Sequence, residues 1–143
     1  LPIVEVVAGG DRPIAEAATD GPAGVRIVAG AHGVRRLGEA VEDGPGRLAS
    51  ALGELAVGRD FLLIDAGSGL GRAAGPLALA ADEVVVVATP EPTAVADAHA
   101  AIRHLSRLLG DRPTRLRALV NQAESAREAS DVLARLAGAS REF

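Results

Sequence analysis

The sequence predicts an α/β fold, with a mostly parallel sheet flanked by helices, and three observations support this prediction. Four short apolar runs alternate along the chain with longer stretches rich in Ala and Leu, which is the order of elements in a parallel α/β sheet. Three of the runs are nearly continuous Val, Ile and Leu without polar alternation, as expected for strands that are covered on both faces. The stretches between them carry apolar residues at helical spacing. We therefore expect one α/β domain over residues 1–143.

The four apolar runs define the predicted strands. They lie at Val25 to Ala29, Phe61 to Ile64, Val84 to Ala88 and Leu116 to Val120. Because these runs alternate with helical stretches, we expect parallel pairing through right-handed crossover connections. Ligands of such sheets bind beyond the carboxyl ends of the strands, so the residues that follow each run form the candidate site.

Three stretches are predicted to be helical. The first, residues 37–55, keeps Leu and Val at helical spacing, although Gly44-Pro45-Gly46 breaks it in two. The second keeps one apolar face until Gly110 and Pro113 end it, and the third runs from Ser125 to Leu136. The predicted inward positions are Val95, Ala98, Ile102, Leu105 and Leu109 in the second helix, and Ala129, Val132, Leu133 and Leu136 in the third.

Composition excludes several classes of function. All 15 cationic side chains are Arg, so no Lys in this chain can form a Schiff base, act as a general base or complete a phosphate-binding loop. The absence of Cys excludes disulfides, thiolate catalysis and Cys-based metal sites. A net charge of -4, interspersed Arg residues and 1% aromatic residues provide neither the basic face nor the stacking rings of a nucleic-acid-binding surface. No apolar run is long enough to span a bilayer, and we expect a cytoplasmic protein.

The run Phe61 to Ile64 ends in a carboxylate, Asp65, at the tip of the predicted strand. A carboxylate there can hold a magnesium-bound water beside a nucleotide phosphate, which is the role of a Walker B Asp. Gly67 and Gly69 follow and permit a loop whose backbone N–H groups approach a phosphate. An Asp at a strand end is also common as a helix cap or a turn residue, so this motif alone leaves both interpretations open.

The same stretch also fits a dinucleotide-binding fingerprint. Gly69 to Ala74 matches G-x-G-x-x-A, and Glu91 follows the next strand, where a Rossmann fold places its ribose-binding acid. Two features oppose this interpretation. Asp65 to Ser68 separate the strand from the first fingerprint Gly, and Gly75-Pro76 interrupts the helix that would bind the pyrophosphate.

Asn121 is the only Asn in the chain and follows the last predicted strand directly. Its carboxamide can donate and accept at once, which suits the edge of an adenine ring, although Asn also commonly caps helices or fills turns. The three His residues lack the spacing of a common metal motif, and we expect His99 and His104 to be surface or half-buried residues of one helix. Arg35-Arg36 is most simply a solvated pair.

Taken together, these motifs resemble the MinD/ParA family of P-loop ATPases, in particular its FlhG branch, which regulates the number of flagella. The resemblance rests on Asp60 to Leu70, on Ala80 to Ala98 with the T-P-E-P-T motif followed by Asp97, and on Leu119 to Asn121. Residues 21–30 are similar to the same branch, so the resemblance covers nearly the whole chain. It implies a P-loop NTPase-like fold of the SIMIBI type, incomplete at both ends.

The resemblance also implies roles for individual residues and for ATP and Mg²⁺ as cofactors of the full-length protein. Asp65 resembles the Walker B residue that binds Mg²⁺ through water, and the loop Gly67, Ser68 and Gly69 resembles switch II, which senses the γ-phosphate. Asn121 is similar to the Asn that recognises adenine. Glu91 and Asp97 match positions near a nucleotide-sandwich dimer interface, and Glu91 is also expected to lie beside the nucleotide.

This chain departs from the family pattern in several places. The phosphate-binding Walker A loop with its two Lys, the switch I Asp, the last strands and the membrane-targeting helix are not found in it, and Gln122 stands where Arg is usual. Because the chain begins with Leu1 and contains no Met, we expect a central segment of an ATPase domain that is inactive alone. The resemblance implies a homodimer formed through bound nucleotide, a partner of the flagellar or division-site type, and membrane contact only through the absent helix.

Two other interpretations remain open. The chain could be a catalytically silent MinD-like interaction module that kept the fold and its dimer surface, because no Lys is present to neutralise a transferred phosphate. It could also be the Rossmann-type dinucleotide-binding domain described above. Sequence upstream of Leu1 separates the first alternative from an ATPase segment, and binding of NAD(H) tests the second.

Overall fold

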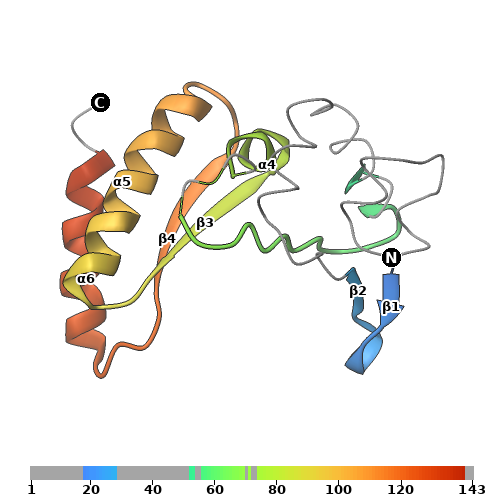
Figure 1. The fold of residues 1–143 in the computed structure, drawn as a ribbon, viewed down its shortest axis with the longest axis horizontal. Coiled ribbons are helices and arrows are strands. Elements are labelled where there is room, and N and C mark those ends of the chain that lie inside the picture. Colours follow the sequence, from blue (N-terminus) through green and yellow to red (C-terminus); the bar gives the residue numbers. More distant parts are fainter. Residues whose placement is uncertain (1–17, 29–51, 54–55, 70, 72–73, 141–143) are drawn as a thin grey trace. The chain divides into compact units, whose positions relative to one another are not determined.

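The structure is a computed structural model that describes residues 18–28, 52–53, 56–69, 71 and 74–140. The chain divides into two compact units, Leu1–Leu77 and Ala78–Phe143, and each is described by itself. The predicted helical stretch at 37–55 lies outside the described residues except at its end, and so do His32 and Arg35-Arg36. Figure 1 shows the elements in chain order, which are β1 (Ala18–Asp20), η2 (Pro22–Gly24), β2 (Arg26–Val28), α4 (Ala74–Ala80), β3 (Glu83–Ala88), α5 (Pro92–Leu109), β4 (Arg115–Val120) and α6 (Ala126–Ser140).

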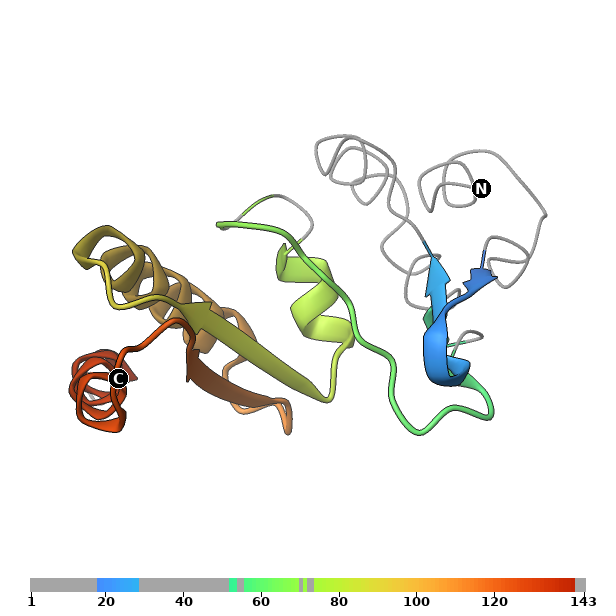
Figure 2. The same ribbon diagram turned by 90° about the horizontal axis from the view of Figure 1, so that it is seen from below.

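The second unit contains a parallel βαβ arrangement that continues into α6. β3 and β4 pair in parallel from Glu83 opposite Arg115 to Ala88 opposite Val120, and α5 forms the connection between them. Both views show α5 and α6 side by side against one face of this pair (Figures 1 and 2). This arrangement confirms the predicted α/β class, because a crossover helix packed on parallel strands is its defining unit.

The core of this unit lies between the strands and the two helices. Its buried members are Ala88, Val95, Ala98, Ile102, Val132 and Leu136, and Val86, Leu116, Ala118 and Val120 pack against them from the strands. All five predicted inward positions of α5 are buried. In α6 the prediction was wrong for Leu133, which is 39% exposed, because the narrow contact of α6 admits only one stripe of side chains, with Val132 and Leu136 at its centre.

α5 begins and ends at residues that are typical of helix ends. Pro92 stands at its first position, where a missing N–H costs no hydrogen bond. Gly110 ends the helix with a φ of 51°, in the left-handed region that favours glycine, and its N–H donates to the Ser106 carbonyl at 3.0 Å. The predicted stop at Gly110 is therefore confirmed, and the start lies three residues before the first predicted apolar position.

The second face of the β3–β4 pair was predicted to be covered and is exposed. Val85, Val87 and Leu119 are each exposed on it, and Arg117 forms an ion pair with Glu83, with Nε 2.9 Å from Oε1. Side chains alternate between the two faces of a strand, so α5 and α6 cover only every second residue. Continuous apolar runs indicate strands with two covered faces, but in the described residues only one layer of helices is present on them.

The predicted parallel strand at Val25 to Ala29 is instead half of an antiparallel hairpin. β2 pairs with β1 so that Ala18 lies opposite Val28 and Asp20 lies opposite Arg26. Between them the chain turns tightly, since the Gly21 N–H donates to the Val25 carbonyl at 2.7 Å and Gly24 has a φ of 78°. A turn this short can join only antiparallel strands, which explains why the parallel prediction was wrong.

Phe61 to Ile64 was predicted to be a strand and has no regular secondary structure. Phe61 is 86% exposed and Leu63 is 92% exposed. A strand is stabilised by hydrogen bonds to a neighbouring strand, and the described part of the chain shows none for this run. The apolar run alone therefore did not specify the element. In the described residues, no helix is both long enough and apolar enough to cross a membrane.

Candidate functional site

The carboxyl edge of the β3–β4 pair brings together two of the predicted polar segments. Ala88 and Val120 are opposite one another at the last position of the parallel register, so Thr89 and Asn121 are the next residues at the same edge. The Asn121 N–H donates to the Ala88 carbonyl at 2.8 Å and extends the ladder by one bond. Of the four predicted segments, the ones that follow β3 and β4 therefore lie together at one strand edge, which is where parallel α/β sheets bind ligands.

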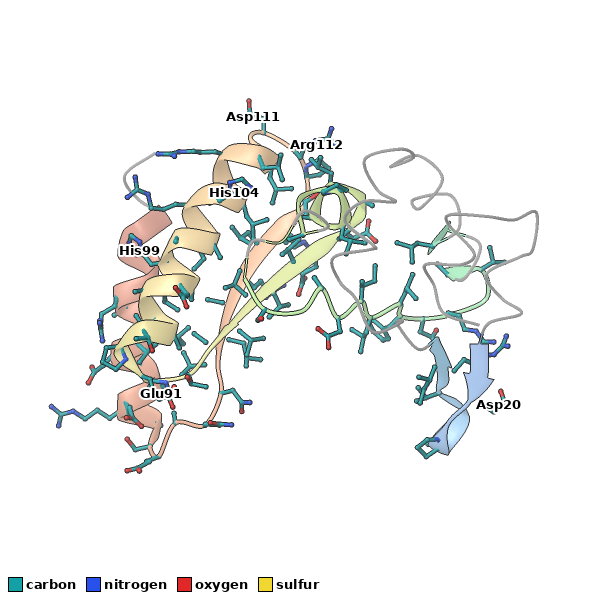
Figure 3. The ribbon with its side chains drawn as sticks, in the orientation of Figure 1. Asp20, Glu91, His99, His104, Asp111 and Arg112 are labelled. Atoms are coloured by element: carbon teal, nitrogen blue, oxygen red, sulfur yellow. The ribbon has the colours of Figure 1, made fainter. Side chains whose placement is uncertain are left out.

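The segment after β3 fixes Glu91 at the start of α5. Glu91 is exposed and directly precedes Pro92, and its carbonyl accepts a hydrogen bond from the Val95 N–H at 3.0 Å. Its carboxylate Oε2 accepts a hydrogen bond from the Thr89 hydroxyl. Figure 3 shows Glu91 at one end of α5, and Asp111 with Arg112 beyond its other end. Glu91 therefore lies at the strand edge where the ligand of an α/β sheet is expected.

Asp97 lies farther along α5 and is exposed. It shares its helix with the buried stripe that begins at Val95 and Ala98, so the helix is anchored to the sheet while Asp97 stays accessible. His99 is half-buried and His104 is exposed, as predicted (Figure 3).

Asn121 and Gln122 form the opposite side of this edge. Both are exposed, and Asn121 Oδ1 accepts a hydrogen bond from the Gln122 N–H at 3.0 Å. Gln122 has a φ of 59°, a conformation that residues other than glycine rarely adopt. Asn121 does not cap α6, because the Ser125 hydroxyl does so by accepting the Glu128 N–H at 3.1 Å. Asn121 therefore acts in a turn, and its amide group stays open to solvent.

Asp65 and the glycines after it lie in the first unit. Asp65 is exposed, and its Oδ1 accepts a hydrogen bond from the Gly67 N–H at 2.9 Å, which is the turn interaction typical of Asp. Gly67 and Gly69 have φ angles of 76° and 77°, and Ser68 between them is exposed. The turn interpretation of Asp65 is confirmed, and its second carboxylate oxygen has no partner among the described residues. The Walker B role stays a prediction.

In each unit taken by itself, the exposed polar side chains are of kinds that can bind Mg²⁺ or a nucleotide. In the described part of the chain, no three acidic or His side chains come together as a metal site. Magnesium rarely uses such all-protein cages, because it keeps waters and binds one or two carboxylates together with substrate phosphates. Asp65 offers one exposed carboxylate of this kind, and the exposed Asn121 amide offers a donor and an acceptor for a base.

The fingerprint Gly69 to Ala74 lacks the surroundings of a dinucleotide site. No strand precedes it within residues 61–67, and of the described fingerprint residues only Ala74 belongs to α4. A Rossmann site requires strand, tight turn and helix in immediate succession. Pro76 lies within the first turn of α4, so the expectation that Gly75-Pro76 interrupts a helix was wrong, because Pro is tolerated in a first turn.

Two further residues at the site have only a weak signal in the sequence. Thr89 belongs to the T-P-E-P-T motif, and its position after a strand and two residues before Glu91 indicates a polar role. Gln122 differs from the family pattern, and its left-handed backbone has no signature in the sequence. Both act at the same edge as the predicted Glu91 and Asn121.

Comparison with known proteins supports the predicted resemblance. The chain is 35% identical over 116 residues to the antiactivator FleN of Pseudomonas aeruginosa. The aligned part is 81% of this chain and 41% of FleN, so the chain spans about two fifths of the length of this relative. No protein-family model matches the chain. FleN is a member of the FlhG branch of the MinD/ParA ATPases, and the predicted similarity to that branch is confirmed.

Proposed function

We infer that this chain, a relative of the FlhG branch of the MinD/ParA ATPases, forms the nucleotide-sensing part of an ATP-dependent switch that regulates the number or placement of flagella. The observation that carries this proposal is the edge where Thr89, Glu91 and Asn121 meet, in a chain similar to FleN over four fifths of its length. Such an edge is where parallel α/β sheets bind nucleotides.

In this proposal each exposed polar group has one task. Asp65 holds Mg²⁺ through a water molecule, and the backbone N–H groups of Gly67 to Gly69 respond to the γ-phosphate. Asn121 pairs with the adenine edge, donating through Nδ2 and accepting through Oδ1. Magnesium supplies charge neutralisation at the phosphates when it is bound.

The full-length protein would bind Mg·ATP between two subunits, with Glu91 and Asp97 near the interface. Both residues are exposed in the described structure, as an interface with a second chain requires. A protein partner of the flagellar or division-site type stimulates hydrolysis, after which the cytoplasmic protein leaves the membrane. Sedimentation of the full-length gene product with and without Mg·ATP tests this step, and a monomer in both states would contradict it.

Replacement of the amide group tests the nucleotide site directly. In the full-length gene product, Asn121→Asp exchanges the donor Nδ2 for a carboxylate oxygen and is expected to lower ATP affinity roughly fivefold to tenfold, since one lost hydrogen bond is worth about 1–1.4 kcal/mol. Asp111→Asn is the matched control, because Asp111 is exposed and lies beyond the opposite end of α5 (Figure 3). Equal affinities of both variants for fluorescent ATP would remove Asn121 from the site.

A silent interaction module is the second candidate, and the absence of Lys favours it. Phosphoryl transfer in this family depends on Lys, and all cationic side chains of this chain are Arg. The DNA upstream of Leu1 separates the two candidates. An in-frame K-G-G-x-G-K-T supports the ATPase, and a start codon close to Leu1 supports the silent module.

A further inference from the structure

The Glu91 carboxylate lies at the amino end of α5 but does not bond to the helix. Glu91 occupies the N-cap position, and its side chain makes no capping hydrogen bond. A carboxylate at such a position is attracted by the free N–H groups of the first turn and by the positive end of the helix dipole. Oε2 of Glu91 instead accepts a hydrogen bond from the hydroxyl of Thr89, the residue that follows β3. Thr89 therefore competes with the helix for this carboxylate.

The two prolines of the T-P-E-P-T motif restrict the backbone that joins these two side chains. Pro90 and Pro92 each have a fixed φ, and each restricts the residue before it to extended conformations. Glu91 has such a conformation, with a φ of -58° and a ψ of 139°. Its carbonyl is also held, because it accepts the Val95 N–H at 3.0 Å. With the backbone fixed in this way, the hydrogen bond from Thr89 decides where the carboxylate lies.

Fixing an exposed side chain in advance matters when that side chain contacts another molecule. Glu91 is exposed, and among the described residues the Thr89 hydroxyl is the polar group that holds its carboxylate. Ordering a free side chain with many rotamers at an interface weakens association by roughly twofold to tenfold. A hydrogen bond that is already present in the free chain reduces this loss, because the carboxylate is ordered before the partner arrives.

We propose that Thr89 is a positioning residue that presents the Glu91 carboxylate to a second copy of this chain in the nucleotide-dependent dimer. The proposal rests on the proposed function, which places Glu91 near that interface. A carboxylate that turned onto the amino end of α5 would spend its hydrogen bonds and its charge on the helix. Held through Oε2 by the Thr89 hydroxyl, the carboxylate keeps Oε1 available to a hydrogen-bond donor of the second copy.

The decisive measurement is the dissociation constant of the dimer, obtained by sedimentation velocity on the full-length gene product with saturating Mg·ATP. Thr89→Val keeps the branch at Cβ and removes the hydroxyl, and it is expected to raise this constant about fivefold, the effect of one side chain that must be ordered on association. Thr89→Ser keeps the hydroxyl and is expected to stay within about twofold of the wild type. A Thr89→Val dimer as tight as that of the wild type would overturn the proposal.

Thr114 provides a matched control for a hydroxyl whose role is structural. Its hydroxyl donates to the Ala81 carbonyl at 3.1 Å, at the amino end of the β3–β4 pair. Thr114→Val is therefore expected to lower the melting temperature measured without nucleotide and to leave the dimer constant unchanged. Thr89→Val is expected to show the reverse, because the freed carboxylate can turn to the amino end of α5, where the helix dipole stabilises it. A fall in the melting temperature of Thr89→Val as large as that of Thr114→Val would assign Thr89 a structural role and overturn the proposal.

Glu91→Ala distinguishes failure of this proposal from failure of the proposed function. If Thr89 acts through Glu91, Thr89→Val has no further effect on the dimer in the Glu91→Ala background, whereas an equal loss in both backgrounds overturns the positioning role alone. Thr89→Ala removes the same hydroxyl without added bulk and replaces Thr89→Val in this comparison if the Val variant does not fold. A wild-type protein that stays monomeric with Mg·ATP would overturn the proposed function and the positioning role with it.

Discussion

Two properties of Asp65 mean that it can be replaced without disturbing the fold. Its side chain is exposed, and Oδ1 bonds only to the N–H of Gly67, two residues ahead in the same loop. Removing an exposed carboxylate that is not part of a core changes stability little. Its second oxygen remains available to a magnesium-bound water.

We therefore predict that Asp65→Ala abolishes magnesium-dependent ATP hydrolysis by the full-length gene product while the fold is retained. Phosphate release reports the activity, and circular dichroism reports the fold. Asp60→Ala is the control, because Asp60 is also exposed and lies just upstream in the same segment. Hydrolysis at the wild-type rate in Asp65→Ala would exclude Asp65 from the magnesium site.

Gln122 and Asp65 also show how far single residues could be predicted. The carboxylate at position 65 was identified as a candidate because an acidic residue after an apolar run is visible in the sequence. The left-handed backbone at position 122 was not, because Gln has no intrinsic preference for it and the conformation depends on the turn between β4 and α6.

α6 is held to the sheet by a narrow apolar stripe. Leu136 is 2% exposed and belongs to the core with Val132 and Ile102, whereas Leu133 on the same helix is 39% exposed. Replacing either Leu by the same residue changes helix propensity equally, so a difference in unfolding free energy between the two variants reports burial.

Leu136→Ala is expected to lower the free energy of unfolding by about 2–5 kcal/mol, because a buried Leu leaves both lost apolar contact and a cavity. Leu133→Ala, the matched control, is expected to cost well under half as much. Urea denaturation followed by circular dichroism at 222 nm measures both. Similar losses for the two variants would contradict the packing of α6 against α5 and β4.

The start of α6 contains a second testable contact. The Ser125 hydroxyl accepts the Glu128 N–H at 3.1 Å, and Glu128 Oε2 accepts the Glu124 N–H at 2.8 Å, so both donors are satisfied at this helix end. Ser125→Ala is expected to cost about 1 kcal/mol of stability, as loss of an N-cap does. Ser130→Ala within the same helix is the control and is expected to be neutral or stabilising, because Ala has the higher helix propensity. A neutral Ser125→Ala in urea denaturation would show that the cap is not needed.

The elements differ in how well the sequence predicted them, and the reason is physical. α5 and α6 were predicted because a helix forms its hydrogen bonds within itself. The spacing of its apolar residues, its caps and the residues that end it therefore all lie in its own sequence. The run Phe61 to Ile64 was wrongly predicted as a strand because a strand forms its hydrogen bonds with a neighbour, which a local pattern cannot identify. β2 was placed correctly within a residue or two, but its antiparallel partner was not predicted.

Across the whole chain, the exposed side chains suit base and magnesium binding, whereas the composition lacks the Lys that neutralises a transferred phosphate. The described residues supply an exposed amide after β4, an acid at the start of α5 and an exposed carboxylate in a glycine turn. Groups that neutralise a transferring phosphate are Lys in this family, and this chain has none. Base recognition and phosphate chemistry are therefore expected to require different segments of the functional protein.

We accordingly predict that these 143 residues alone do not bind ATP with micromolar affinity. The base contact through Asn121 amounts to a few hydrogen bonds, each worth about 1 kcal/mol, whereas micromolar affinity requires about 8 kcal/mol. Isothermal titration of the 143-residue chain with Mg·ATP tests this, with the full-length gene product titrated in parallel as the positive control. Micromolar binding by the 143 residues would show that Arg side chains and backbone N–H groups of this chain hold the phosphates without Lys.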